Sequence, residues 1–330
     1  MKWLRNLGLP FSVLYGWIVW LRNKFYDWGW FPSKSYEVPV LCIGNLSTGG
    51  SGKTPMAEWF LSNLLPERKV AVLSRGYKRE TKGFHLVSPQ NTVAEVGDEP
   101  LQMARKFPEA VVAVDADRQR GIEQLMALSA PEIILLDDGF QHRRVRPAKA
   151  VLLTAYDELY PQEAYLPVGN LRDHRSQARR ADLIVVTKCP SPLSEGDRQR
   201  IRRKLALREG QELAFASLCY GQIRDRRGAL IPEKDLKNNK FTLVTGIARP
   251  EPLVAYLKKS GIQFEHLKYS DHHKFSTLEL NVLKQRQPLL TTEKDAVRLE
   301  GALEAFYVLP VQHCFSQEDQ GVMQAFLSSI

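Results

Sequence analysis

The stretch Val38-Pro-Val-Leu-Cys-Ile-Gly-Asn-Leu-Ser-Thr-Gly-Gly-Ser-Gly-Lys-Thr-Pro55 decides the fold of this chain. An apolar, strand-like run passes into a glycine-rich turn that ends in Gly52-Lys53-Thr54, and a helical pattern follows. Glycines let backbone N–H groups converge on phosphate oxygens, and the amino end of the helix adds partial positive charge. In such a loop the lysine reaches the β- and γ-phosphates and the threonine hydroxyl coordinates Mg²⁺. The stretch therefore predicts a P-loop that binds ATP and Mg²⁺.

The match to the pattern G-x-x-x-x-G-K-[ST] is imperfect, because Ser47 stands at the first glycine position. Gly49 and Gly50 supply backbone freedom in its place. The residues expected to hold the nucleotide are Ser47, Thr48, Gly49, Gly50, Ser51, Gly52, Lys53 and Thr54.

A second strand-like run, 132–138, is apolar and ends in Asp137 and Asp138. Parallel strands present their carboxyl ends at one edge of a sheet, so these carboxylates are expected beside the P-loop. There they would hold Mg²⁺ together with Thr54, directly or through water. A pair of aspartates after an apolar run is weak evidence alone, but with the P-loop upstream it predicts a P-loop NTPase or kinase.

The rest of the chain alternates between β-branched runs, among them 70–73, 111–114 and 133–136, and helical stretches. Continuous apolar strands are typical of a parallel sheet that is covered on both faces, so the fold class is α/β. A second α/β series begins near Phe241, after a polar, turn-rich segment. We expect an N-terminal amphipathic helix in residues 1–34, a P-loop kinase domain in 35–222 and a smaller C-terminal α/β domain in 223–330.

The composition excludes several classes of protein. Hydrophobic residues make up 44% and charged residues 25% of the 330 residues, which excludes disordered chains and polytopic membrane proteins. A formal charge of +9 suits nucleic acid, an anionic membrane surface or a phosphorylated substrate. The four cysteines are scattered and predict free thiols in a reducing compartment, against a disulfide framework or a zinc site.

The first thirty residues combine tryptophan with basic residues. Their longest uncharged run, 7–21, is too short to cross a bilayer, which needs about 20 apolar residues. The apolar residues at helical spacing are Leu14, Trp17, Ile18, Leu21, Phe25 and Trp28. This pattern predicts an amphipathic helix lying in an anionic membrane surface. The alternative is a helix that packs its aromatic face on its own domain.

Longer strings of residues point to one family. The strings are the P-loop, Ser74-Arg-Gly-Tyr77, Gly97-Asp-Glu-Pro100, Asp137-Asp-Gly-Phe-Gln-His142 and Thr292-Glu-Lys-Asp-Ala296. Together they resemble tetraacyldisaccharide 4'-kinases, the lipid A 4'-kinases, over most of the chain. The resemblance implies transfer of the γ-phosphoryl group of ATP to the 4'-hydroxyl of a tetraacyldisaccharide 1-phosphate. It also implies two α/β domains with the active site between them, at the cytoplasmic face of the bacterial inner membrane.

The resemblance also implies roles for individual residues. Asp98 and His272 match the catalytic pair, with Lys53 beside the transferring phosphoryl, and which of the pair accepts the proton stays open. A base is needed because a sugar hydroxyl is a poor nucleophile until its proton is accepted. His273 adjoins His272 and is the second choice. Segments 245–250 and 291–295 are expected to close over the nucleotide.

Arginine binds phosphate through two-pronged hydrogen bonds, which suits a disaccharide 1-phosphate. The residues expected to contact this substrate are Arg118, His142, Asn170, Arg172 and Asp173.

Two other functions remain open alternatives. One is a P-loop kinase for a soluble phosphorylated metabolite, whose tryptophan-rich helix is only part of the core. The other is a basic, nucleic-acid-dependent ATPase or a nucleotide-controlled membrane partner protein. No nucleic-acid-binding motif is visible, so no nucleic-acid partner is expected. No obligate protein partner is predicted either.

Overall fold

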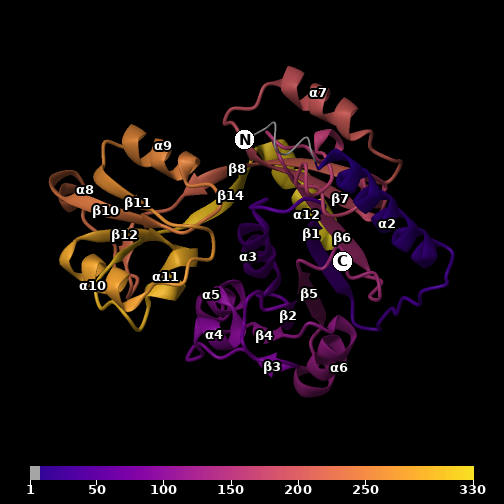
Figure 1. Ribbon diagram of the computed structural model, residues 1–330, viewed down its shortest axis with the longest axis horizontal. Helices are drawn as coiled ribbons and strands as arrows, with labels where there is room; N and C mark the ends of the chain where they lie inside the picture. The colour runs from indigo at the N-terminus through magenta and orange to yellow at the C-terminus, as the bar shows by residue number, and fades with distance from the viewer. Residues whose placement is uncertain (1–7) are drawn as a thin grey trace.

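The computed structural model describes residues 8–330, and the first part of the predicted N-terminal segment, residues 1–7, lies outside the described residues. Two sheets with flanking helices make up the described chain, which confirms the expected α/β class (Figure 1). The nine-stranded sheet has the spatial order β14 (Val311–Phe315), β8 (Glu212–Tyr220), β7 (Leu183–Cys189), β6 (Lys149–Ala155), β1 (Val40–Asn45), β5 (Ile133–Asp137), β2 (Val70–Ser74), β4 (Val111–Val114) and β3 (His85–Leu86). The five-stranded sheet has the order β11 (Gln263–Lys268), β10 (Lys240–Thr245), β12 (Leu289–Thr292), β13 (Tyr307–Leu309) and β9 (Arg224–Asp225).

Helices lie against both sheets. Those of the larger unit are α3 (Lys53–Leu64), α4 (Val93–Val96), α5 (Asp98–Lys106), α6 (Arg118–Ser129), α7 (Glu195–Leu205) and α12 (Gln317–Ser328), with short 3₁₀ turns η1 (Tyr160–Gln162) and η2 (Arg175–Arg180). Those of the smaller unit are α8 (Glu233–Asn238), α9 (Glu251–Lys259), α10 (Thr277–Gln285) and α11 (Glu293–Leu299). The N-terminal helix is α2 (Leu9–Asp27).

The seven inner strands of the larger sheet are all parallel, and the edge strands β3 and β14 pair antiparallel to their neighbours. Strand β1 is buried along its whole length, as a strand covered on both faces must be. Its register with β5 sets Ile43 opposite Asp137. The P-loop that follows β1 and the aspartates that end β5 are thereby brought to the same edge of the sheet.

The end of the chain differs from the expected division at residue 223. The chain leaves the larger sheet after β8, builds the five-stranded sheet from residues 224–309, and returns through β14. Strand β14 pairs with β8, and Met323 and Phe326 of α12 are buried in the core under the larger sheet. Residues 311–330 therefore lie with the larger sheet, because β14 pairs with β8 at its edge and the apolar face of α12 packs in its core.

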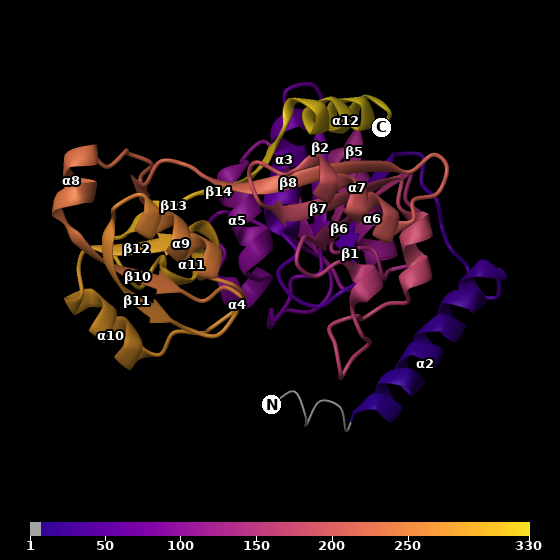
Figure 2. The same cartoon turned by 90° about the horizontal axis from the view of Figure 1, so that it is seen from above.

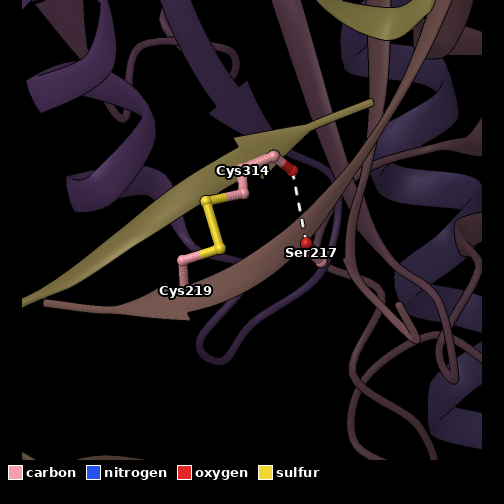
Figure 3. Close-up of a disulfide and its surroundings, with 3 residues drawn as sticks. All are labelled: Ser217, Cys219 and Cys314. Atoms are coloured by element: carbon pink, nitrogen blue, oxygen red, sulfur yellow. Dashed lines mark hydrogen bonds between the residues drawn. A yellow bond between two sulfur atoms is a disulfide. The ribbon is translucent and has the colours of Figure 1, made fainter. Parts of the chain in front are cut away.

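A disulfide joins the two strands through which the chain passes between the sheets. Cys219 of β8 and Cys314 of β14 are bonded, and Figure 3 shows the bond bridging the two antiparallel strands. Cys42 and Cys189 are free and buried. The expectation that all four cysteines are free thiols is therefore wrong for Cys219 and Cys314. Strand pairing across 95 residues brought them together, and no local spacing could reveal it.

Helix α2 faces the protein with its polar side. Its buried residues are Ser12, Gly16, Val19 and Asn23, whereas Trp17 and Ile18 are 63% and 58% exposed. Figure 2 shows α2 along the margin of the molecule. The expected amphipathic helix is present, but its aromatic face does not pack on its own domain. Among residues 8–330, no helix is both long enough and apolar enough to cross a membrane.

Candidate active site

The conformation of the phosphate loop, residues 47–54, is set by its glycines and by side chains around it. Gly49 and Gly52 have φ of 106° and 82°, in the left-handed region that favours glycine. Gly52 is the residue before the first turn of α3, so the free N–H groups of that turn lie at the loop. Asn45 donates to Ser51 Oγ at 2.8 Å, which closes the loop on the end of β1.

Two aspartates and two cations face each other beside the loop. Lys53 Nζ lies 3.8 Å from Asp138 Oδ1, and Arg172 forms a bidentate ion pair with the same carboxylate. Burial alone would raise the pKa of Asp138, but the charges of Lys53 and Arg172 outweigh it and lower the pKa. Asp138 also has a left-handed backbone, with φ of 48°, a strain of about 1–3 kcal/mol that is common at functional sites.

Asp137 is the better candidate for a metal ligand. Its Oδ2 accepts a hydrogen bond from Ser74, while its buried Oδ1 has no partner. Burial, with the charges of Glu99 and Asp138, raises the pKa of Asp137 to about 7. A cation beside this carboxylate would therefore stabilise its ionised form. Within residues 8–330, no group of three or more His, Cys, Asp or Glu side chains forms a complete metal site. Mg²⁺ needs only one or two carboxylates when phosphates supply other oxygens, so the residues fit this ion.

The two sheets bring Asp98 and His272 together. Asp98 is the first residue of α5, and His272 lies in the loop after β11 of the smaller sheet. His272 Nδ1 donates to Asp98 Oδ2 at 2.7 Å, which leaves Nε2 as the acceptor of the neutral ring. His272 has φ of 56°, a left-handed backbone that turns its ring toward α5. The sequence strings that carry these residues lie far apart, and only the fold joins them.

Two further cations of α11 surround the pair. Arg298 donates from Nε to Asp98 Oδ2 at 3.0 Å and from Nη1 to Asp295 at 2.8 Å. Lys294 Nζ lies 3.2 Å from His272 Nε2. Burial opposes the charge of Asp98, but the hydrogen bond from His272 and the charges of Lys294 and Arg298 hold its pKa well below the usual range. Asp98 is therefore a carboxylate anion near neutral pH.

The two adjacent histidines have different partners in the structure. His273 Nε2 contacts the carboxylate of Glu279 at 3.0 and 3.1 Å. That carboxylate also accepts from the backbone of Ser276 in the capping box of α10. His273 thus supports a helix end, while His272 contacts Asp98.

One cleft of about 450 Å³ contains most of the expected site residues. Its walls come from both sheets, and segments 245–250 and 291–295 contribute to the side that faces the P-loop. The expected residues that line it are Ser47, Thr48, Gly49, Gly50, Ser51, Gly52, Lys53, Thr54, Asp137, Asp138, Arg172 and His272. Phosphate-binding groups, carboxylates for a cation and the imidazole of His272 therefore share one space. Asp98 is buried and does not line the cleft, but it contacts the cleft through its hydrogen bond with His272.

A second, strongly basic cavity of about 320 Å³ lies at the base of α2, by which we mean the C-terminal end that carries Arg22 and Tyr26. Arg118 and His142 line it, together with Arg22, Arg143 and Arg144. Burial and the neighbouring charges of Arg118 and Arg75 lower the pKa of His142 to about 4, so its ring is neutral near pH 7. Such a cavity suits an anionic group.

Asn170 and Asp173 line neither of these two cavities. The backbone carbonyl of Asn170 accepts hydrogen bonds from Thr48, so this residue supports the phosphate loop. Asp173 is fully buried and accepts from Asn23 Nδ2 of α2 at 2.7 Å. Its carboxylate holds α2 against the larger unit. Because this carboxylate is buried, it is not accessible to a sugar.

Several residues of the site had no role assigned from the sequence, and the signal that could have found them differs from residue to residue. Lys294 lies in one of the quoted strings, and Arg298 follows it by one helical turn, a spacing that places both on one face of α11. Thr187 and His313 contact the phosphate loop from β7 and β14, and their own segments resemble ordinary strands. Their positions follow from the strand order alone.

Comparisons with known proteins agree with this geometry. The family model described as Tetraacyldisaccharide-1-P 4'-kinase matches residues 4–330. A Flavobacterium johnsoniae protein named tetraacyldisaccharide 4'-kinase is 41% identical over 336 residues, covering 100% of this chain and 98% of the relative. A Parabacteroides distasonis protein of the same name is 42% identical, covering 96% and 92%. A crystal structure described as an "apo" form of LpxK from Aquifex aeolicus in complex with ATP has a TM-score of 0.80 and 31% identity, covering 98% of each chain.

Proposed function

This chain belongs to the tetraacyldisaccharide-1-P 4'-kinase family, and from this premise we propose how its own residues carry out the reaction. It is an ATP-dependent kinase of lipid A biosynthesis, and the acceptor is the 4'-hydroxyl of tetraacyldisaccharide 1-phosphate. The soluble-metabolite kinase and the nucleic-acid-dependent ATPase are not favoured, because the match extends over nearly the whole chain. The observation that supports the assignment in this structure is the cleft shared by the P-loop, Asp137 and His272, whose ring is bonded to the buried Asp98.

The phosphate loop binds the phosphates of ATP. Backbone N–H groups of residues 47–54 surround the β- and γ-phosphates, and the amino end of α3 adds its partial charge. Lys53 turns from Asp138 to the transferring phosphoryl group, whose negative charge it neutralises. Arg172 keeps Asp138 paired when the lysine moves away.

Asp137 and Thr54 are the residues that would hold Mg²⁺, with Asp138 beside them. The ion would neutralise charge on the phosphates during transfer. The unpartnered Asp137 Oδ1 supports this assignment within the chain itself.

The Asp98–His272 pair accepts the proton of the 4'-hydroxyl. His272 lines the cleft, and Asp98 orients its ring through their hydrogen bond of 2.7 Å. Arg298 keeps the pair's carboxylate in place while the hydroxyl oxygen attacks phosphorus and its proton leaves. Closure of the cleft walls from the smaller sheet over bound ATP would exclude water and limit hydrolysis of ATP.

The basic cavity at the base of α2 binds the anionic end of the substrate. Arg118, His142 and Arg143 line it, and the charges of the arginines favour an anion there. The 1-phosphate is the negatively charged group of the disaccharide that does not react, and a phosphate suits arginine forks. Binding it beside α2 would leave the acyl chains on the same side as the exposed apolar face of that helix.

Helix α2 lies on the membrane that supplies the lipid. Its exposed residues include Phe11, Leu14, Trp17 and Ile18, an apolar set that membrane lipid would cover. Because ATP is cytoplasmic, we propose that the surface is the cytoplasmic face of the bacterial inner membrane, and that its anionic lipids attract the basic chain.

Purified full-length chain, ATP, Mg²⁺ and tetraacyldisaccharide 1-phosphate in vesicles test the proposal. The wild type should phosphorylate the lipid, and no product would refute the function. Lys53→Ala should lose about 10²–10³-fold in kcat, because the phosphoryl group loses a fixed cation. Asp98→Ala should lose about 10²–10⁴-fold in kcat while binding ATP normally. Lys284→Ala, on the exposed side of α10, is the matched control and should keep wild-type activity.

A further inference from the structure

Two successive carbonyl groups of the phosphate loop are bound by side chains from outside the loop. Thr187 Oγ1, on β7, donates to Ser51 O at 2.8 Å. His313 Nε2, on β14, is 2.9 Å from Gly52 O. A carbonyl can only accept, so the imidazole is the tautomer that carries its hydrogen on Nε2.

These contacts control the direction of the N–H groups that a phosphate would use. In a planar trans peptide the carbonyl oxygen of one residue and the N–H of the next point in opposite directions. A donor on Ser51 O therefore aims the N–H of Gly52 away from β7, and a donor on Gly52 O aims the N–H of Lys53 away from β14. Both amides belong to the part of the loop that lines the cleft.

Both donors are buried, and Ser51 O is the nearer of the two carbonyls that the Thr187 hydroxyl reaches, since Thr154 O lies at 3.4 Å. Thr187 is fully buried and His313 is 4% exposed, so water does not compete for either carbonyl. Burial lowers the pKa of His313 to about 4, which keeps the ring neutral at physiological pH. The ring also packs directly on the loop, because a Cβ added to Gly52 would lie 2.8 Å from His313 Nε2.

We propose that His313 and Thr187 are positioning residues for ATP, which bind the Ser51 and Gly52 carbonyls and thereby fix the amides that hold the phosphates. The proposal rests on the proposed function in one respect, that residues 47–54 bind the phosphates of ATP. Its new content is that the nucleotide site depends on β14. That strand lies about 260 residues after the loop in sequence and enters the larger sheet directly from the five-stranded sheet.

Paired substitutions separate the hydrogen bond from the bulk of each side chain. His313→Phe keeps an aromatic ring but removes the donor, whereas His313→Gln keeps an N–H at similar reach. Thr187→Val and Thr187→Ser form the second pair. The readouts are the dissociation constant of ATP and of ADP in the absence of lipid, and KM for ATP together with kcat in the kinase assay.

His313→Phe and Thr187→Val should each weaken ATP and ADP binding about tenfold, and should raise KM for ATP far more than they lower kcat. His313→Gln and Thr187→Ser should stay within about threefold of the wild type. Gln312→Ala, exposed on the same strand, is the control and should bind normally. If His313→Phe does not fold, the Thr187 pair decides alone.

Two outcomes would overturn the inference. One is that His313→Phe and Thr187→Val bind both nucleotides as the wild type does. The other is that the donor-retaining variants lose as much affinity as the donor-lacking ones, since packing and not the hydrogen bond would then matter. A wild type that binds ATP but leaves the lipid unphosphorylated would refute the kinase function and leave this inference standing.

Discussion

Charge is distributed unevenly among the carboxylates around the cleft. Asp98 is surrounded by Arg298, Lys294 and His272 and stays ionised, whereas Asp137 is buried with one oxygen unpaired and holds a proton up to about pH 7. The same residue type therefore has two electrostatic states, a fixed anion beside an imidazole and a buried carboxyl with one unpaired oxygen, which we propose as a cation site. Only the neighbours of each residue make this difference.

Glu58 is a third buried carboxylate near the cleft, and it links three helices. It accepts hydrogen bonds from Gln102 at 2.7 Å and Lys106 at 2.8 Å on α5, and Lys106 also pairs with Glu293 of α11. Burial raises the pKa of Glu58 from 4.5 to about 7, although Lys106 opposes the rise. The residue lies on α3, two turns from the phosphate loop at most.

We therefore expect a pH-dependent stability from Glu58. Because the folded-state pKa is the higher one, its contribution is fully present below about pH 4.5 and is lost as the pH rises through 7. Between about pH 5.5 and 8, the free energy of unfolding of the wild type should fall by about 2 kcal/mol more than that of Glu58→Gln. Urea unfolding at both pH values measures this. Glu67→Gln is an exposed control, and parallel pH curves for all three proteins would contradict the expectation.

Among the elements, the strands of the larger sheet were the most predictable. The runs at 70–73, 111–114 and 133–136 became β2, β4 and β5, because a strand buried on both faces must be apolar along its length. Strand β14 was different. The sequence predicts neither its pairing with β8 nor its contact with the phosphate loop, since a half-buried edge strand does not specify its partner.

Helix α2 supports a prediction about membrane binding. Its exposed face is apolar and its buried face is small and polar, the reverse of a helix on a soluble core. Trp17→Glu with Ile18→Glu should lower the partition coefficient onto vesicles containing anionic lipid by at least about tenfold, because two apolar side chains leave the lipid. Sedimentation with vesicles measures the bound fraction.

Leu128→Glu is the matched control for α2, because this residue on α6 is also 58% exposed and is away from that face. It should bind vesicles as the wild type does. If the double variant also partitions normally, the apolar face of α2 does not contact the membrane.

At the scale of the molecule, the disulfide encloses the whole five-stranded sheet. Cys219 and Cys314 are 95 residues apart, and strands β9 to β13 all lie between them. We propose that residues 224–309 form the smaller domain, and that residues 35–220 form the larger one together with β14 and α12. The bond then ties the entry to the exit of the smaller domain.

Reduction of this bond should destabilise the protein. Closing a loop of 95 residues limits the unfolded chain, which is worth about 4–5 kcal/mol in the chain-entropy model. The free energy of unfolding should therefore fall by a large part of this amount when a reductant is present. The double variant Cys219→Ser, Cys314→Ser should be as unstable as the reduced wild type and indifferent to reductant. Finding both thiols free in the unreduced protein by alkylation and mass spectrometry would contradict the bond.

The sequence by itself determined the P-loop, the acidic end of β5 and the apolar helix at the amino end, because each is a local pattern whose chemistry depends on near neighbours. It also contained Asp98 within a recognisable string, and His272 beside a second histidine. The tertiary structure decided which residues contact one another. His272 and Arg298 bond to Asp98, Asp173 bonds to Asn23 of α2, and His313 bonds to the phosphate loop. These contacts join segments up to about 260 residues apart, and the order of strands in a sheet, which no local pattern specifies, brought them together.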